Sequence, residues 1–383
     1  MRMFGKFTMI ALITAVSHGW LCFTAKAAGF CRVCVANKFA SKLRYITTAG
    51  MLLLCITGCS RQTSGVYIAG NIELNNGNNV AVYWKNGEII ALSGGTGATW
   101  ANSIAVSGSD VYVSGIEADG VGRIYPVYWK NGEKIALPSE AEQQAWASAV
   151  AVLGGDIHIA GRELNVNDQG IFFTAVYWKN GVKSALTEGP LSSLANCIAL
   201  VNSDVYIAGN DSNGEPAGIK AVYWKKGERI VLAGNLGSAQ INADVRAMTV
   251  SGSDVYFVGS EDNKVVYWKN GLLKEITDGT LISNANAIAV SQSGVYIVGQ
   301  EVNDKGRTVA VYWKNGKKTV LTKTENSGMA NAVALDHSDL YIAGKETGSN
   351  INSAVYWKNG NMVVLDCGKN AVTAAAVDIV VIP

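Results

Sequence analysis

The sequence is poor in the residues and motifs that enzymes use for catalysis. It has three histidines in 383 residues, and none stands at a spacing from Cys, Asp or Glu that would hold a metal. It contains no Gly-x-Ser-x-Gly sequence, which marks a nucleophilic serine, and no Asp-rich loop of the EF-hand type. The sequence therefore shows no catalytic set, and we expect no metal and no other cofactor.

Charged residues are also scarce. They make up 16% of the chain, against 49% apolar residues, so the material for a core is ample. Residues 1–58 contain seven Lys or Arg and no Asp or Glu, which leaves 25 basic and 30 acidic residues, or about −5, for residues 59–383. A mildly acidic body is not typical of a nucleic-acid-binding protein, and we expect no nucleic acid as partner.

One phrase, Val-Tyr-Trp-Lys-Asn-Gly, recurs seven times with small changes. Its tryptophans are Trp84, Trp129, Trp178, Trp224, Trp268, Trp313 and Trp357, at intervals of 45, 49, 46, 44, 45 and 44 residues. A fixed period in the forties indicates a repeat architecture, in which each repeat is one structural unit.

Each repeat predicts four short strands, which we name a to d. In the second repeat these are Ala101–Val106, Val111–Gly115, Pro126–Lys130 and Glu133–Leu137. The runs are β-branched or aromatic, none has a helical period, and Asn131-Gly132 between c and d is a strong hairpin signal because both residues tolerate positive φ. A β-sandwich does not repeat seven times at one period, and a solenoid coil is usually shorter.

The pattern therefore predicts an all-β fold, a seven-bladed β-propeller with four antiparallel strands per blade. The first repeat begins at strand b, whereas the last continues past its strand d into Ala374–Val377, which we align with Ser103–Val106. We expect this C-terminal strand to complete the N-terminal blade, which would close the ring and remove an exposed edge.

The order of the runs, with Val-Tyr-x-x-Gly in strand b and Tyr-Trp in strand c, resembles the kelch repeat over Val66–Val377. It departs from that pattern because strand b ends in one Gly rather than two and because the Tyr–Trp spacing differs. No Trp-Asp dipeptide is present, so a WD40 assignment is weaker. The resemblance implies a propeller of the kind found in secreted bacterial proteins, but it does not by itself imply a function.

The N-terminal segment has the pattern of a signal peptide. Basic residues precede the apolar run 51–55, and Ile56-Thr57-Gly58-Cys59 follows. Cys59 lies seven residues before the first predicted strand. This ending resembles the lipobox of bacterial lipoproteins, which implies cleavage before Cys59 and a lipid anchor on it. Ser60 then favours export to an outer membrane, in an organism that has one. An ordinary signal peptide or a short membrane anchor is the alternative.

The expected organisation is a leader at 1–58, a tether at 59–65 and a propeller at 66–380. Residues 1–37 contain a second apolar stretch, 7–16, and we interpret them as the product of a start codon assigned too far upstream. A membrane-spanning extension is the alternative, although neither stretch reaches the ~18–20 apolar residues that a span needs. Cys31-x-x-Cys34 has no second pair, and Cys197 and Cys367 are expected half a ring apart and unbridged.

Loop lengths distinguish the two faces of the predicted ring. The a–b and c–d connections are tight and nearly constant, whereas the b–c and d–a connections vary, from 261–264 to 211–220. We call these sides the tight-turn face and the variable face, and we expect binding on the variable face. The seven tryptophans are expected in the core. The Lys after each of them forms a ring on the tight-turn face, which we interpret as solvated charge.

A carboxylate recurs two residues after the glycine of strand b. The carboxylates are Glu117, Glu163, Asp211, Glu261, Glu301 and Glu346, with Glu73 one place later in the first repeat. We call them the acidic ring. They could form a crown that binds cations or a partner, but their repetition favours a structural role in which each carboxylate accepts backbone N–H groups.

Two tryptophans break the repeat. Trp100 and Trp146 precede strand a in adjacent blades, where other blades have Leu194, Asp244, Asn284, Met329 and Ala371. Beside them a polar ring is predicted at Asn102, Ser148, Asn196, Arg246, Asn286, Asn331 and Thr373. Aromatic plates next to amide groups suit a sugar or peptide ligand at the channel mouth. Packing of loops is the alternative.

The sequence thus favours a monomeric, lipid-anchored envelope protein that binds a glycan or an envelope protein through its variable face, without catalysis. A carbohydrate-active enzyme with carboxylates at the channel mouth and a scaffold subunit of an envelope complex are the alternatives. Paired carboxylates could act as acid and base, but the sequence marks no pair among the seven.

Overall fold

The computed structural model describes residues 64–383 except 96, 141–143, 169, 213–217, 233–241, 324 and 349–350, together with three strands near the N-terminus. The chain divides into two compact units, residues 1–60 and 61–383. In the first unit β1 (Leu12–Val16), β2 (Trp20–Thr24) and β3 (Val33–Ala36) form an antiparallel sheet in that order. The expected lipidation residue Cys59 lies outside the described residues. None of the described residues belongs to a helix long and apolar enough to span a membrane.

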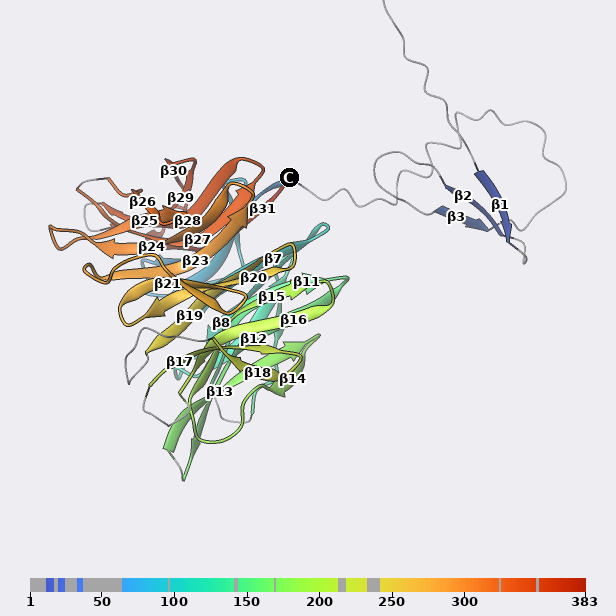
Figure 1. Cartoon of the computed structure of the whole chain (residues 1–383), viewed down its shortest axis with the longest axis horizontal. Helices are drawn as coiled ribbons and strands as arrows, with labels where there is room; N and C mark the ends of the chain where they lie inside the picture. The colour runs from blue at the N-terminus through green and yellow to red at the C-terminus, as the bar shows by residue number, and fades with distance from the viewer. Residues whose placement is uncertain are drawn as a thin grey trace, which may run out of the picture. The chain divides into compact units, whose positions relative to one another are not determined.

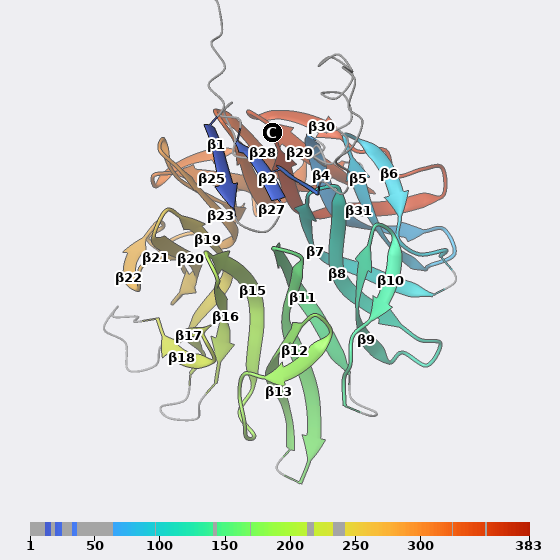
Figure 2. The same ribbon diagram turned by 90° about the vertical axis from the view of Figure 1, so that its right-hand side faces the viewer.

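The second unit is a ring of seven four-stranded antiparallel sheets, which confirms the predicted seven-bladed propeller (Figure 1, Figure 2). The innermost strands, a, of blades 1 to 7 are β31 (Ala371–Ile382), β7 (Ala98–Ser107), β11 (Ala145–Leu153), β15 (Ser193–Val201), β19 (Ala243–Ser251), β23 (Ser283–Ser291) and β27 (Ser327–Asp336). The b strands are β4 (Gly65–Leu74), β8 (Asp110–Ala118), β12 (Asp156–Asn167), β16 (Asp204–Asp211), β20 (Asp254–Glu261), β24 (Gly294–Val302) and β28 (Asp339–Gly348).

The outer two strands of each blade follow in the same order. The c strands are β5 (Asn79–Lys85), β9 (Ile124–Lys130), β13 (Gly170–Lys179), β17 (Lys220–Lys225), β21 (Lys264–Lys269), β25 (Thr308–Lys314) and β29 (Ile351–Lys358). The d strands are β6 (Glu88–Ala91), β10 (Glu133–Ala136), β14 (Val182–Ala185), β18 (Glu228–Val231), β22 (Leu272–Glu275), β26 (Lys317–Val320) and β30 (Asn361–Val364). Each innermost strand contacts the innermost strands of both neighbouring blades, so the ring is closed.

The C-terminal strand closes the ring as predicted, but in a different register. β31 pairs with β4, and its Asp378 lies opposite Ala69, in the place that Ser103 takes opposite Ser114 in blade 2. The alignment of Ala374 with Ser103 was therefore wrong by four residues. The apolar run 374–377 resembles the repeat, but β31 pairs with β4 four residues further along. A Cβ on Gly70 would lie 2.5 Å from the carbonyl oxygen of Ala375, so only glycine fits there.

The Asn-Gly pairs form the predicted c–d turns. Asn131 has φ 52° and Gly132 has φ 87°, and six blades repeat the pattern with Asn while blade 4 has Lys226 at φ 53°. Positive φ at both central residues is the signature of a type I′ turn, whose twist matches that of the strands. The Oδ1 of Asn131 also accepts the N–H of Val111 at 2.8 Å, so the turn residue joins strand c to strand b.

The core lies between the blades. It consists of seven hydrophobic clusters, each shared by two neighbouring blades and each containing one of the seven repeat tryptophans, whose exposed fractions are 0–2%. This confirms their expected core role. The glycine of strand b makes room for the tryptophan side chain of strand c. A Cβ on Gly115 would lie 2.0 Å from the backbone oxygen of Trp100 and 2.9 Å from the indole ring of Trp129.

Candidate functional site

An axial pocket of about 340 Å³ lies where the innermost strands of all seven blades meet. In each of these strands the pairing with strand b slips by one residue, and the extra residue of this β-bulge lines the pocket. A bulge re-aims one side chain away from the ladder. The bulge residues are Asn102, Ser148, Asn196, Arg246, Asn286, Asn331 and Val377.

The structure therefore brings together six of the seven residues of the predicted polar ring. The seventh, Thr373, lies four residues before the bulge residue Val377 and pairs with Glu73 instead, because β31 takes the register described above. The pocket consequently has one apolar position in its ring.

Four amides of the ring also hold neighbouring blades together. The Nδ2 groups of Asn102, Asn196, Asn286 and Asn331 donate to the carbonyl oxygens of Ala147, Val245, Ala330 and Ala376, at 2.8–2.9 Å. Each acceptor precedes the bulge of the next blade. These amides are thus oriented by the scaffold, with Nδ2 committed to the neighbouring blade and Oδ1 as the remaining polar atom of the side chain.

Two charged residues line the axial pocket. Arg246 comes from the bulge of β19, and its Nε donates to Asp244 at 2.8 Å. Its side chain is 49% exposed, so the rest of the guanidinium remains accessible. The second is Asp378, which sequence reasoning missed because the predicted register of the last strand placed it elsewhere.

Asp378 accepts two backbone N–H groups, from Ile104 of blade 2 at 2.9 Å and from Ile379 at 2.8 Å. Burial raises the pKa of this carboxyl group, and the hydrogen bonds from Ile104, Ser103 and Ile379 oppose that rise. Asp378 thus joins the C-terminal strand to blade 2. It is the one carboxylate among the residues that line the axial pocket.

Trp100 and Trp146 do not line the axial pocket. They lie opposite Ile116 and Arg162 of the neighbouring b strands. Trp146 packs edge-on against Phe173, with ring centroids 5.8 Å apart, and the guanidinium of Arg162 lies 4.9 Å from the Trp146 ring centroid. The predicted grouping of both tryptophans with the polar ring is therefore not formed: Trp100 stays on β7 of blade 2, and Trp146 belongs to a separate cluster in blade 3.

Five of the seven carboxylates of the acidic ring lie inside the blades. Glu163, Asp211, Glu261, Glu301 and Glu346 are at most 5% exposed. In four blades the carboxylate pairs with a cation of strand d in the same blade, at 2.5–2.8 Å: Glu117 with Lys134, Glu163 with Lys183, Asp211 with Arg229 and Glu301 with Lys318. Burial and pairing favour the structural interpretation of these carboxylates over a surface crown.

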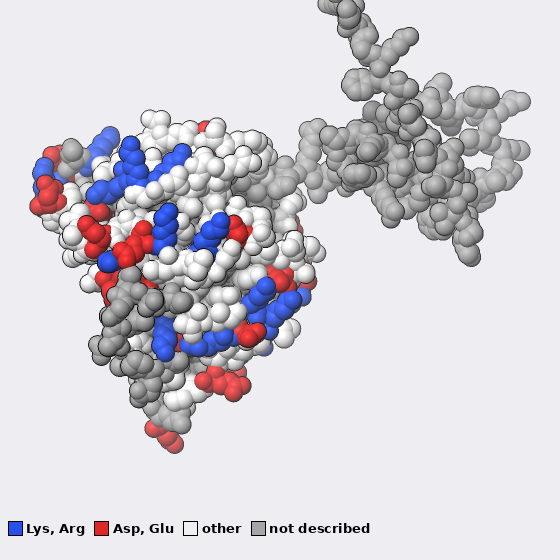
Figure 3. All heavy atoms as spheres, in the orientation of Figure 1, with Lys and Arg blue, Asp and Glu red and all other residues white. Residues whose placement is uncertain are grey.

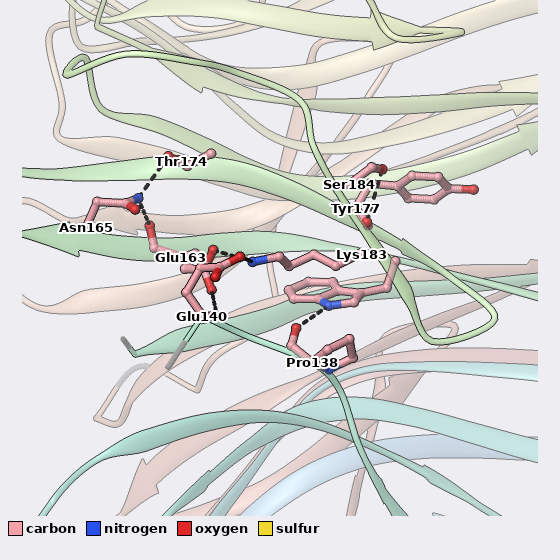
Figure 4. Close-up of polar contacts among 9 residues, drawn as sticks. Pro138, Glu140, Glu163, Asn165, Thr174, Tyr177, Lys183 and Ser184 are labelled. Carbon is pink, nitrogen blue, oxygen red and sulfur yellow. Dashed lines mark hydrogen bonds and ion pairs between the residues drawn. The ribbon is translucent and has the colours of Figure 1, made fainter. Parts of the chain in front are cut away.

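Blade 3 shows the arrangement in detail (Figure 4). Glu163 accepts the Lys183 ammonium at 2.8 Å and the backbone N–H of Glu140 at 2.6 Å. The carboxylate of Glu140 accepts the same ammonium at 2.7 Å. Burial by itself would lower the pKa of Lys183, but the hydrogen bonds and charges of Glu140 and Glu163 outweigh it and raise the pKa. The Glu163 carboxylate thus joins strand d to the connection that leads into the blade.

Blade 1 replaces this ion pair by apolar residues. Ile72 takes the place of the carboxylate and is 2% exposed, and Ile89 takes the place of the cation and packs on the same cluster. Glu73, the member assigned to blade 1, lies one place later and is only partly buried, with Thr373 donating to it at 3.4 Å.

In five of the seven blades the lysine on the tight-turn face is ion-paired while 36–51% of its side chain stays exposed, so a salt bridge is added to the solvated charge predicted from the sequence. In five blades the lysine contacts the first Asp of strand b at 2.7–3.5 Å, in the pairs Lys130–Asp110, Lys179–Asp156, Lys225–Asp204, Lys269–Asp254 and Lys358–Asp339. In six blades it lies over the strand-b tyrosine, 4.8–5.5 Å from the ring centroid. Figure 3 shows basic and acidic side chains lying next to one another in short rows on the side of the molecule that it draws.

The remaining nucleophilic and titratable groups do not converge. His158 replaces the strand-b tyrosine, is 5% exposed, and shares a 2.6 Å hydrogen bond with the Tyr177 hydroxyl. His337 is an exposed turn residue beside Asp336. Cys197 and Cys367 are free thiols, as expected, and burial raises the pKa of Cys197 to about 12. Within the described residues, no three His, Cys, Asp or Glu side chains could hold a metal.

Comparisons with known proteins identify the fold but no family. No protein-family model matches the chain, and no curated protein matches it significantly. A puromycin hydrolase structure is similar with a TM-score of 0.51 at 9% identity, over 81% of this chain and 54% of that one. A puromycin-hydrolyzing peptidase of Mycobacterium tuberculosis has a TM-score of 0.48 at 13% identity, over 71% of this chain and 47% of that one. TolB from Acinetobacter baumannii has a TM-score of 0.43 at 9% identity, over 96% of this chain and 82% of that one.

The similarity to the puromycin hydrolase structure shows the propeller fold alone, because the identity is so low. This chain spans about half the length of that protein and of the mycobacterial peptidase. Neither activity therefore transfers to this chain through the fold.

Proposed function

We propose that this chain is an exported, lipid-anchored, kelch-like propeller that binds a glycan in its axial pocket from the variable face, without catalysis. The observation that carries the proposal is the ring of bulge side chains turned into the pocket. It offers amide oxygens, the Ser148 hydroxyl and the Arg246 guanidinium at positions held by the closed ring of strands. Hydrogen-bond donors and acceptors held at fixed positions suit the hydroxyl groups of a sugar, which can both donate and accept hydrogen bonds.

The size and the charge of the pocket support a binding role. About 340 Å³ lies within the range of small-ligand pockets, which begins at ~300 Å³. Hydrolysis of a glycosidic bond usually needs two carboxylates, one on each side of the bond. The lining contains one, Asp378, and its oxygens already accept two backbone N–H groups. We therefore favour recognition over turnover, and a carbohydrate-active enzyme is the less supported alternative.

The anchor and the tether follow from the sequence. The Ile56-Thr57-Gly58-Cys59 ending and the few residues between Cys59 and β4 support a propeller held close to a membrane, with its variable face available to an envelope glycan. Labelling cells with an alkyne fatty acid tests the anchor. We expect label on the full chain and none on the Cys59→Ala variant; label on both would show that Cys59 is not the acceptor.

The binding role is tested by a glycan array followed by titration calorimetry on the full chain. Ser148→Leu should block the pocket, because the leucine side chain enters the bulge ring while the four amide bonds between blades remain. We expect at least about 10-fold weaker binding, equivalent to ~1.4 kcal/mol, at an unchanged melting temperature. Ser203→Leu, in the exposed turn at 202–203 on the opposite face, is the matched control. Binding that survives Ser148→Leu would place the glycan site elsewhere.

A further inference from the structure

A second candidate site lies in blade 3, on the longest b–c hairpin of the described chain. β12 and β13 continue their ladder to the pair Asn167 and Gly170, and in both views the hairpin reaches past the neighbouring strands at the lower edge (Figure 1, Figure 2). Alternation places Leu164, Val166, Phe173 and Ile171 on the same side of this ladder as Arg162. We call these five residues and Trp146 the hairpin surface.

Blade 6 shows which residues take the corresponding positions elsewhere in the ring. In blade 6, Asn284, Gln300 and Thr308 occupy the places of Trp146, Arg162 and Phe173. There they line a cavity of about 360 Å³ together with residues of blade 7. Blade 3 thus places two aromatic rings and a guanidinium where blade 6 has uncharged polar side chains.

No carboxylate in the described part of the chain forms an ion pair with Arg162. Its Nε is buried, and no acceptor within the described residues hydrogen-bonds it. Its guanidinium lies 4.9 Å from the Trp146 ring centroid and 5.6 Å from that of Phe173. Burial lowers the pKa of Arg162, and no neighbouring carboxylate counteracts this. Since arginine stays charged in proteins, the site holds a half-buried cation that two aromatic faces compensate only in part.

Lys183, in the same blade, shows the contrast. It is similarly enclosed, with 17% of its side chain exposed, but two carboxylates bind it at 2.7 and 2.8 Å (Figure 4). Within the described residues, one enclosed cation of blade 3 is therefore paired with carboxylates and the other is not. Beyond Arg162 the surface becomes aliphatic, with Val166 at 65% and Ile171 at 73% exposure directly opposite each other.

We propose that the hairpin surface binds a segment of a partner protein in which a carboxylate side chain is flanked by apolar side chains. The carboxylate would accept the planar N–H fork of Arg162, and the apolar side chains would cover Val166 and Ile171. Arg and Trp at the centre of an interface are the residue types that contribute most to protein binding. A glycan fits less well, because Arg162 already covers the Trp146 ring and the outer part of the surface is aliphatic.

A random 12-residue peptide library displayed on phage, selected on the full chain, tests the proposal. We expect the selected peptides to place Asp or Glu beside Leu, Ile, Phe or Trp. By calorimetry, Arg162→Met and the exchange of the peptide's Glu for Gln should each weaken binding at least about 10-fold. A selection that yields no peptide, peptides without a carboxylate, or peptides that bind the Arg162→Met variant equally would overturn the proposal. Binding of oligogalacturonate in place of peptides, lost with Arg162→Met, would also overturn it in favour of an acidic glycan.

Thermal stability separates binding from a structural role. Arg162→Met should melt at or above the temperature of the parent chain, because it removes an uncompensated charge. Lys183→Met is the matched control: it should lower the melting temperature and leave peptide affinity unchanged. An Arg162→Met variant that melts as low as Lys183→Met would make Arg162 structural. This site is independent of the axial pocket, so Ser148→Leu should not alter peptide binding.

Discussion

Exchanging the buried ion pair of blade 3 for the apolar pair of blade 1 tests how the acidic ring stabilises the propeller. Lys183→Ile leaves Glu163 buried, with the N–H of Glu140 at 2.6 Å as its one remaining donor of those described above. The double variant with Glu163→Ile copies Ile72 and Ile89, which fill the same two positions in blade 1. The Lys183→Ile variant should therefore be less stable to unfolding than the double variant.

The size of the effect follows from burial. The side chain of Glu163 is 4% exposed, so solvent cannot replace the lost ammonium. Removing one partner of a buried pair costs ~3–5 kcal/mol, and we take the lower end because Lys183 is partly exposed. Unfolding entropy is ~2.1 cal/mol/K per residue, or ~0.7 kcal/mol/K for a unit of about 320 residues, so 3 kcal/mol lowers the melting temperature by ~4 °C. The double variant should stay within ~1–2 °C of the parent chain.

Differential scanning calorimetry of the parent chain, both single variants and the double variant gives the coupling free energy between the two positions. We expect the double variant to recover most of the loss caused by Lys183→Ile. The interpretation is that burial of the Glu163 carboxylate makes the Lys183 cation necessary. It would be refuted by a Lys183→Ile variant that melts within 1 °C of the parent chain, or by a double variant that melts below both single variants.

Three further predictions concern pH and packing. Hydrogen bonds from Asn and Lys side chains hold the pKa of Asp110, Asp156, Asp204, Asp254 and Asp339 below the usual 3.8. Their stabilisation is present above pH ~4 and is lost as the pH falls through the folded pKa values, so replacing all five by Asn should flatten the fall in melting temperature below pH 4; an equal fall would contradict this. Burial lowers the pKa of His158 below 6.5, so the parent chain should lose stability as the pH falls from 6.5, whereas His158→Tyr, the residue of the other six blades, should melt alike at pH 7.5 and 5.5. Equal pH dependence in both chains would show that another group titrates. Gly115→Ala should cost ~3 kcal/mol or more, because its Cβ would lie 2.0 Å from the Trp100 oxygen, whereas Gly120→Ala, with no atom within 4 Å, should be neutral in thermal unfolding.

The candidate sites show how far local pattern predicts position. Asn102, Asn196, Arg246, Asn286 and Asn331 were predicted to lie together, and they line the axial pocket because each occupies the same place in its repeat. Trp146 was assigned to the same mouth, but the β-bulge at Ser148 interrupts the alternation and turns that side chain into the pocket, whereas Trp146 stays in the regular ladder opposite Arg162. Its actual neighbours, Arg162 and Phe173, come from two other strands of the blade.

The sequence by itself determined the strands, the turns and their sevenfold repetition. These depend on neighbouring residues: alternating apolar side chains favour strands, and Asn-Gly favours the tight turn that joins c to d. Tertiary structure decided three further features: the register of β31, the burial of the acidic ring and the exposed hairpin surface. Each depends on atoms from distant parts of the chain, such as the Ile104 N–H that donates a hydrogen bond to Asp378, 274 residues away. Local preference cannot specify such contacts, because they exist only once the ring has closed.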